Sequence, residues 1–121
     1  MSRSVLPLAA LVALASALPA TASQGAHAAA SCHLSASEQR HLGATYVTSL
    51  SVRHTSCASG KAVVRAFHAC ARRHGVRGRC TSPVLGYHCS EKRSGIPTQF
   101  TGKVTCTRGR ASVVHTYTQF I

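Results

Sequence analysis

Apolar and polar residues alternate with different periods along the chain, and these periods predict its elements. Residues 45–53 show the period of two that is typical of a half-buried strand. One predicted face of this strand carries Tyr46, Thr48, Leu50 and Val52. Three later stretches also have strand character, namely residues 84–91, 99–107 and 111–120. Turns are expected between them at residues 94–97 and at Gly109.

The apolar residues recur with a helical period between Cys57 or Ala58 and His74, which predicts the main helix. Ser56 or Ser59 is the expected N-cap, and Gly75 is the expected terminator. The face that should contact the core carries Val63, Ala66, Phe67, Cys70 and His74. The opposite face carries Lys61, Arg65, His68 and Arg72.

The order of the elements indicates an α+β fold. A capping box formed by Ser35 and Glu38, followed by Gly43, predicts a further short helix. The main elements then follow in the order β-α-β-β-β, which favours one main helix packed on a three- to four-stranded, largely antiparallel sheet. Residues 31–121 are enough for one small domain, and no internal repeat indicates a second.

Residues 1–30 have the layout of a secretory signal peptide. Arg3 precedes an apolar run over residues 5–18, and small residues follow over 19–30. The apolar run is too short for a helix across a hydrocarbon core of roughly 30 Å. Cleavage is expected between Ala22 and Ala30, each of which ends an A-x-A pattern. These features predict a secreted, extracellular protein with no membrane span.

The cysteines all follow the predicted leader, and an even number in an exported chain predicts three disulfides. The six are Cys32, Cys57, Cys70, Cys80, Cys89 and Cys106. Cys70 with Cys80 is the leading pair, because these residues flank the turn after the main helix. Cys57 with Cys89 or Cys106 is the next, because the start of a helix packed on a sheet approaches such positions. Six cysteines allow fifteen pairings, so the sequence leaves the connectivity open.

The chain is strongly basic, with 14 lysines and arginines against two glutamates, for a formal net charge of +12. Such a charge attracts anions over a long range. We expect a basic, monomeric module that binds an anionic surface or polymer of the cell envelope, or an acidic protein, and binds nucleic acid nonspecifically in vitro. A merely solvated helix face is the alternative explanation of the candidate binding residues. They are Lys61, Arg65, His68, Arg72, Arg73, Arg77 and Arg79.

Catalysis is not expected, because the chain contains no aspartate for a Ser-His-Asp triad. The enzymatic alternative is an RNase-like phosphodiesterase. In that hypothesis His88 and His115 act as acid and base while lysine or arginine stabilises the charge on phosphate. It requires both histidines to reach one surface.

Zinc is a further alternative, because Cys70, His74 and Cys80 are residue types that bind this metal, with His88 and Cys89 further along the chain. No C-x-x-C pair occurs, and export favours oxidised sulfur. We therefore expect neither a metal nor another cofactor.

A small protease inhibitor is the third function class. Residues 93–98 contain a proline and could form an exposed loop that a protease binds. An ordinary hairpin loop is the favoured explanation of the same residues.

Four stretches, LGATYVTSLSVRHTSC, GKAVVRAFHACARRHG, GYHC and VVHTYTQF, resemble a group of uncharacterised, short, secreted, cysteine-containing actinobacterial proteins. The resemblance covers roughly residues 32–120. It implies secretion and a shared small fold, and it implies no activity, ligand or catalytic residue.

Overall fold

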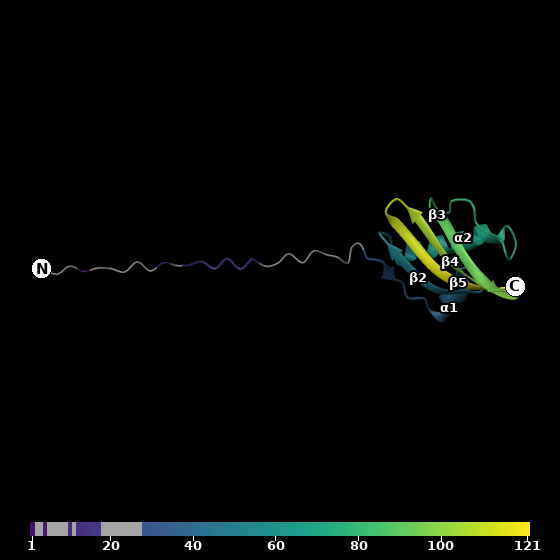
Figure 1. The fold of residues 1–121 in the computed structure, drawn as a ribbon, viewed down its shortest axis with the longest axis horizontal. Helices are drawn as coiled ribbons and strands as arrows, with labels where there is room; N and C mark the ends of the chain where they lie inside the picture. The colour runs from purple at the N-terminus through teal and green to yellow at the C-terminus, as the bar shows by residue number, and fades with distance from the viewer. Residues whose placement is uncertain (2–3, 5–9, 11, 18–27) are drawn as a thin grey trace.

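The computed structural model describes residues 1, 4, 10, 12–17 and 28–121, and the fold lies in the last of these ranges (Figure 1). Its strands are all antiparallel and form one sheet in the order β1-β2-β5-β4-β3. This confirms the predicted α+β fold with one main helix, and β1 adds a short fifth strand at the edge. The elements along the chain are β1 (Ala30–Ser31), α1 (Ala36–His41), β2 (Tyr46–Arg53), α2 (Cys57–Arg72), β3 (His88–Ile96), β4 (Gln99–Arg108) and β5 (Ala111–Phe120).

The predicted signal peptide falls largely on residues 2–3, 5–9, 11 and 18–27, which lie outside the described part of the chain. Ala22, one expected end of the leader, is among them. Ala30, the other, pairs with Val52 in β1, so a cut after Ala30 would remove half of that strand. Among the described residues, no helix is long and apolar enough to cross a membrane.

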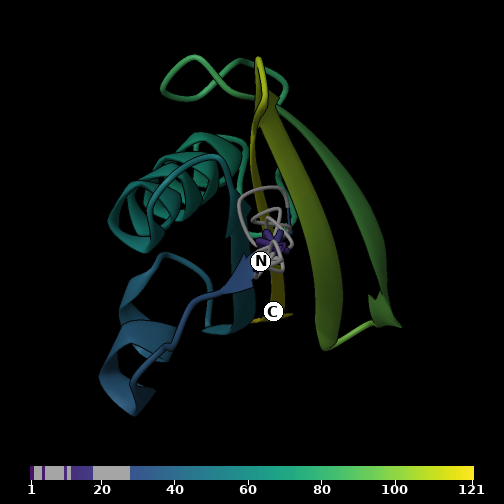
Figure 2. The ribbon, with the colours of Figure 1, turned by 90° about the vertical axis from the view of Figure 1, so that its left-hand side faces the viewer.

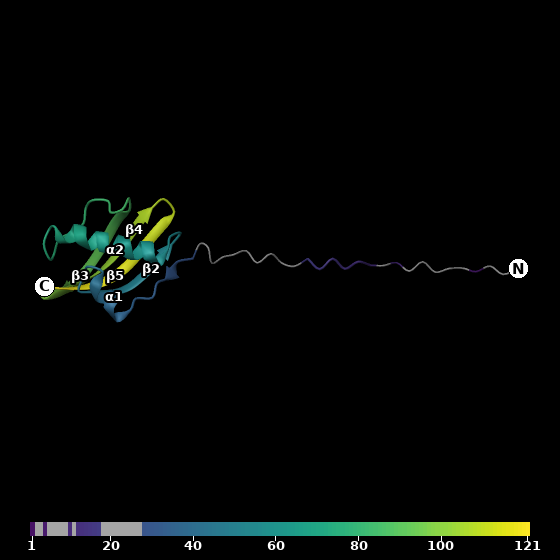
Figure 3. The same cartoon turned by 180° about the vertical axis from the view of Figure 1, so that it is seen from behind.

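Both helices lie on one face of the sheet, and no described element covers the other face (Figures 2 and 3). β5 runs between β2 and β4, so its inward side chains Val113, His115 and Tyr117 are buried. The core fills the space between this face and α2. Its largest fully buried apolar side chains include Phe67, Leu42, Val47, Val63, Val64 and Val104.

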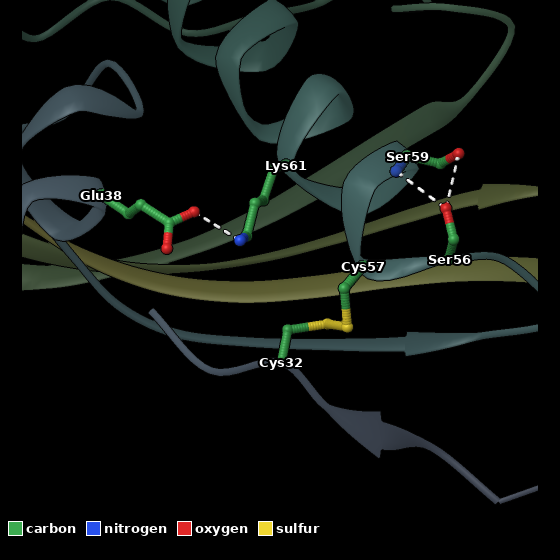
Figure 4. Close-up of a disulfide and its surroundings, with 6 residues drawn as sticks. All are labelled: Cys32, Glu38, Ser56, Cys57, Ser59 and Lys61. Atoms are coloured by element: carbon green, nitrogen blue, oxygen red, sulfur yellow. Dashed lines mark hydrogen bonds and ion pairs between the residues drawn. A yellow bond between two sulfur atoms is a disulfide. The ribbon is translucent and has the colours of Figure 1, made fainter. Parts of the chain in front are cut away.

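The start of α2 is fixed by a cap and by a close contact with the sheet. The Ser56 hydroxyl accepts a hydrogen bond from the Ser59 amide at 3.0 Å, so Ser56 is the N-cap (Figure 4). One turn later, a Cβ at Gly60 would lie 2.6 Å from Cγ1 of Val52. Glycine weakens the helix here but permits its close approach to β2.

The end of α2 differs from the prediction. The helix ends at Arg72, two residues before His74, and Gly75 takes the expected left-handed conformation with φ of +93°. The prediction that His74 shares the buried face is wrong, because this side chain lies beyond the helix and is exposed.

A β-bulge changes the inward face of β2. The pairing with β5 shifts between Val47 and Ser49, which leaves Thr48 as the extra residue. Val47 therefore points inward with Leu50, and Thr48 is exposed. The prediction that Tyr46 and Thr48 share the face of Leu50 is wrong for this reason.

The first strand after the helix was predicted over residues 84–91 but begins at His88. Leu85 and Gly86 both have positive φ, of 49° and 78°, and Val84 and Tyr87 exchange two backbone hydrogen bonds around them. This is a tight two-residue turn. Alternation along the predicted strand 84–91 would place Leu85 on the same face as Tyr87, but Leu85 is 57% exposed whereas Tyr87 is buried.

Three disulfides cross-link the domain, as predicted. Cys70–Cys80 is the expected pair and joins the end of α2 to the following loop. Cys57 bonds to Cys32, which fixes the start of α2 to the segment after β1 (Figure 4). Cys89 bonds to Cys106, its partner in the register of β3 and β4. The expected pairing of Cys57 with Cys89 or Cys106 is therefore wrong, because these two sulfurs face each other across neighbouring strands.

Candidate functional site

The structure divides the predicted cationic residues into three groups. Arg65, Arg72 and Arg73 are exposed at the outer surface and end of α2, as the helix pattern indicated. Arg77 and Arg79 are exposed on the loop after the helix. The other two residues, Lys61 and His68, do not belong to an exposed cationic stripe.

Lys61 is held by an ion pair. Its ammonium group contacts the carboxylate of Glu38 at the first turn of α1 (Figure 4). The Glu38 carboxylate also accepts a hydrogen bond from the Ser35 amide in the predicted capping box. The hydrogen bond from Lys61, with that from Ser35, lowers the pKa of Glu38 below its ordinary value. The charge of Lys61 is thus balanced within the domain.

His68 was predicted to lie on the exposed face of α2, and this prediction is wrong. Its side chain is only 4% exposed, and its Nε2 lies 2.9 Å from Nε2 of His115 on β5. The buried face of α2 is wider than its apolar residues indicate, because a histidine of the sheet supplies a polar partner for His68. The rings of Phe67 and Tyr117 pack edge-on around His68.

The two histidines form one buried, uncharged pair. Burial lowers the pKa of His115 to about 4, and burial together with the neighbouring His115 lowers the pKa of His68 to about 3. Nδ1 of His115 is buried with no hydrogen-bond partner. At such a nitrogen, an unpaired lone pair costs less free energy than an unpaired N–H group. We therefore assign the shared proton to Nε2 of His115, which donates to Nε2 of His68.

This pair is not an accessible catalytic site. The cavity beside His68 has a volume of about 10 Å³, room for no more than about one water molecule. His88, the other predicted catalytic residue, is exposed and pairs with Thr107, whereas His115 pairs with Val104. Thr107 and Val104 point to opposite faces of β4. The convergence of His88 and His115 that a phosphodiesterase requires is therefore absent.

Two further sequence hypotheses also meet structural obstacles. The zinc hypothesis needs thiolates on Cys70 and Cys80, and these sulfurs are bonded to each other. The inhibitor hypothesis needs an exposed loop over residues 93–98. Residues up to Ile96 instead belong to β3, and Ile96 pairs directly with Gln99, which leaves a two-residue turn. The favoured hairpin interpretation is the one that the structure shows.

Arg93 links this hairpin to the loop after α2. Its guanidinium donates hydrogen bonds to the carbonyl oxygens of Arg77 at 2.8 Å and Gly78 at 2.5 Å. Arg77 in turn donates to the carbonyl oxygen of Pro97 at 2.8 Å. Together with the Cys70–Cys80 disulfide, these bonds fix a loop that otherwise has no helix or strand.

Arg77, Arg79 and Arg93 border one open groove of about 600 Å³, which we call the arginine groove. Its other side is formed by residues 94–97 of the β3–β4 hairpin and by Phe100. The guanidinium of Arg93 lies over the ring of Phe100, 4.4 Å from its centroid, so it forms part of the floor. Arg79 has 56% of its side chain exposed, and both Arg77 and Arg79 are open to solvent.

The negative charge of Glu91 lies beneath this groove and partly balances the charges of its arginines. Its side chain is 6% exposed, and its Oε1 lies 2.9 Å from Nε of Arg93 and 3.7 Å from Nη1 of Arg79. The hydroxyl of Tyr117 donates to the other carboxylate oxygen. Burial, with this hydrogen bond to Glu91, raises the pKa of Tyr117 above its ordinary value. Glu91 is thus buried between Arg93 and Tyr117, and of the two exposed groove arginines it contacts only Arg79, at 3.7 Å.

Gly102 makes room for the contact between Tyr117 and Glu91. A Cβ at this position would overlap the Tyr117 ring and lie 2.8 Å from Oε2 of Glu91. We expect Gly102→Ala to lower the free energy of unfolding by about 2 kcal/mol through overpacking. Urea unfolding measures it, with Thr101→Ala at the exposed neighbouring position as the control. Equal stability of the two variants would contradict this packing.

Sequence reasoning identified Arg77 and Arg79 but not Arg93 or Glu91. Residues 93–98 were expected in a loop, so the inward direction of Arg93 was not recognised, and the strand was expected to end at Glu91. Their inward face carries Cys89 but otherwise polar side chains, so no apolar period marks it. Comparison with protein-family models, curated proteins and solved structures gave no match.

Proposed function

We propose that this protein is a secreted, basic, disulfide-cross-linked module that binds an anionic polymer, such as a polymer of the cell envelope, through the arginine groove. The observation that carries the proposal is the pairing of the two glutamates within the domain. Glu38 is paired with Lys61, and Glu91 is buried against Arg93 with a longer contact of 3.7 Å to Arg79. No other carboxylate side chain exists in the chain to balance Arg77 and the remaining exposed arginines.

The groove is also chemically suited to phosphate or carboxylate groups. Arginine presents a planar fork of N–H donors that matches the oxygens of these anions. The internal bonds of Arg93 and the Cys70–Cys80 disulfide hold the groove in place before a ligand arrives, which reduces the entropy lost on binding. Arg72 and Arg73 at the end of α2 extend the cationic surface beyond it.

The three disulfides support a location outside the cell. Disulfides persist in oxidising compartments and are rare in reducing ones. A rigid and strongly basic domain of this kind would remain attached to a polyanion after export, at a strength set by the salt concentration.

The test measures binding of the oxidised protein to immobilised polyphosphate over a series of salt concentrations. We expect the affinity to fall steeply with salt and Arg77→Gln/Arg79→Gln to reduce the slope of log K against log salt by about 1.5, since each lost phosphate contact removes about 0.7 to 0.9. Isolated cell-wall polymer, tested in parallel, should show the same dependence on the two arginines.

The matched control is Arg53→Gln/Arg110→Gln, which removes the same charge. Both residues are exposed at the β4–β5 end of the sheet, whereas the groove lies at the β3–β4 turn. The ten residues of β4 separate these ends by roughly 30 Å. Salt-insensitive binding, or an equal loss in both double variants, would refute the arginine groove as the site.

A further inference from the structure

The face of the sheet opposite the helices carries two lysines that no carboxylate side chain balances. Lys92 of β3 and Lys103 of β4 are directly opposite each other in the strand register, and both are exposed. Like charges in this arrangement destabilise a sheet. Glu38 lies beside α2, and Glu91 points to the inward face of the sheet. An anion bound between the two lysines would relieve their repulsion.

The two lysines border a shallow hollow of about 530 Å³. Hydroxyl groups from four strands line the same hollow, on Thr48, Ser94, Thr101, Thr116 and Thr118. Several are ordered by one another: the hydroxyl oxygens of Thr48 and Thr116 are 2.7 Å apart, and those of Ser94 and Thr101 are 3.3 Å apart. Each hydroxyl has more than one hydrogen-bonding position, so such pairs can still bond to a polyhydroxylated ligand.

An aromatic pair lies at one end of this hydroxyl surface. The rings of Tyr46 and Phe120 meet edge-on with centroids 5.6 Å apart, and Tyr46 pairs in register with Thr118. The guanidinium of Arg40 lies 5.9 Å from the Tyr46 ring, whereas Phe120 is 48% exposed. Phe120 therefore offers an open apolar ring beside the hydroxyl groups.

We propose that this outer face binds an acidic polysaccharide whose sugar units carry carboxylates. Lys92 and Lys103 would bind a carboxylate, the hydroxyls would bond to sugar hydroxyls, and the ring of Phe120 would pack against the apolar face of a sugar. Lys103 pairs with Thr116, four residues along β5 from Phe120, which corresponds to roughly 13 Å. The surface is therefore long enough to contact several sugar units of an oligosaccharide rather than one sugar. The two lysines and the hydroxyl groups lie on the other face from the helices, and the hollow adjoins the arginine groove at Arg93 and Ser94.

Calorimetric titration of the oxidised protein with polygalacturonate oligosaccharides tests the proposal, with uncharged dextran and polyphosphate as comparison probes. We expect Lys92→Gln/Lys103→Gln to weaken binding at least about tenfold, the loss expected from charged hydrogen bonds. Phe120→Ala should weaken it severalfold. Arg53→Gln/Arg110→Gln removes the same charge from exposed residues that line neither the hollow nor the arginine groove, and it should leave polygalacturonate binding within about twofold of the wild type.

The results that overturn the proposal are distinct from those that refute the arginine groove. Unchanged polygalacturonate affinity in the lysine variant would show that the outer face is not the site. Equal weakening in the lysine and arginine variants would show general attraction by net charge. Tighter, lysine-dependent binding of polyphosphate would assign the face to phosphate polymers, and a dimer that Phe120→Ala dissociates would assign it to a second copy of the chain.

Discussion

Replacing Glu91 by glutamine is expected to lower the free energy of unfolding by about 3 kcal/mol, the loss typical of a buried ion pair that loses one partner. The variant keeps nearly the same shape but removes the charge next to Arg93. It also leaves Tyr117 with a neutral acceptor in place of the carboxylate. Because Arg93 also supports the loop of the arginine groove, we expect the variant to bind polyphosphate less tightly as well.

Chemical unfolding monitored by circular dichroism measures this change. Glu38 provides the control, because it is the only other carboxylate side chain in the sequence and is partly exposed. Glu38→Gln removes a solvated ion pair, so its effect should be much smaller. If the two variants lost the same stability, Glu91 would not be the buried partner that the geometry indicates.

Acid is expected to destabilise the domain through His68 and His115. Burial holds their pKa values near 3 and 4, below the ordinary value of 6.5 that they regain on unfolding. The unfolded chain therefore binds more protons over this interval, and stability falls as the pH drops below about 6.5. The expected slope approaches 1.4 kcal/mol per pH unit for each histidine. Above pH 7 the pair should contribute no pH dependence.

Unfolding midpoints between pH 4 and pH 8 test this expectation. His115→Phe should flatten the curve, because it removes one of the two buried histidines whose pKa values burial lowers. The matched control is His88→Ala, which changes an exposed histidine and should leave the slope unaltered. A wild-type curve that is flat from pH 4 to pH 6.5 would contradict the buried, uncharged pair.

Local sequence signals predicted those parts of the fold that depend on local chemistry. The capping box at Ser35, the left-handed residues Gly75 and Gly109, and the Cys70–Cys80 bond each involve residues close together in the chain. The last strand was predicted over residues 111–120 and has those bounds, because apolar and polar residues alternate along it.

Features that depend on distant partners were not predictable in the same way. His68 has the position of a surface residue on α2 and becomes buried only because β5 brings His115 to it. Arg93 turns inward because Glu91, Phe100 and the loop after α2 supply its partners. The turn at Leu85 requires a positive φ that sequence patterns rarely assign to leucine.

The same distinction applies to the candidate site. The sequence indicated a cationic surface and named Arg77 and Arg79, which do border the arginine groove. It could not show that Lys61 is balanced by Glu38, since this pair joins two helices. The outer lysines could have been noticed, because Lys103 alternates with Val104 and Cys106 along β4 and must therefore face away from the core.

The most direct test of the central claim, that the arginine groove binds polyanions through Arg77 and Arg79, is a residue-level map of binding. Nuclear magnetic resonance spectra of the oxidised protein would be recorded while polyphosphate is added. The claim predicts that the largest changes occur in the side-chain N–H signals of Arg77 and Arg79 and in the amides of residues 94–96. Changes spread evenly over all exposed arginines, including Arg53 and Arg110, would contradict it.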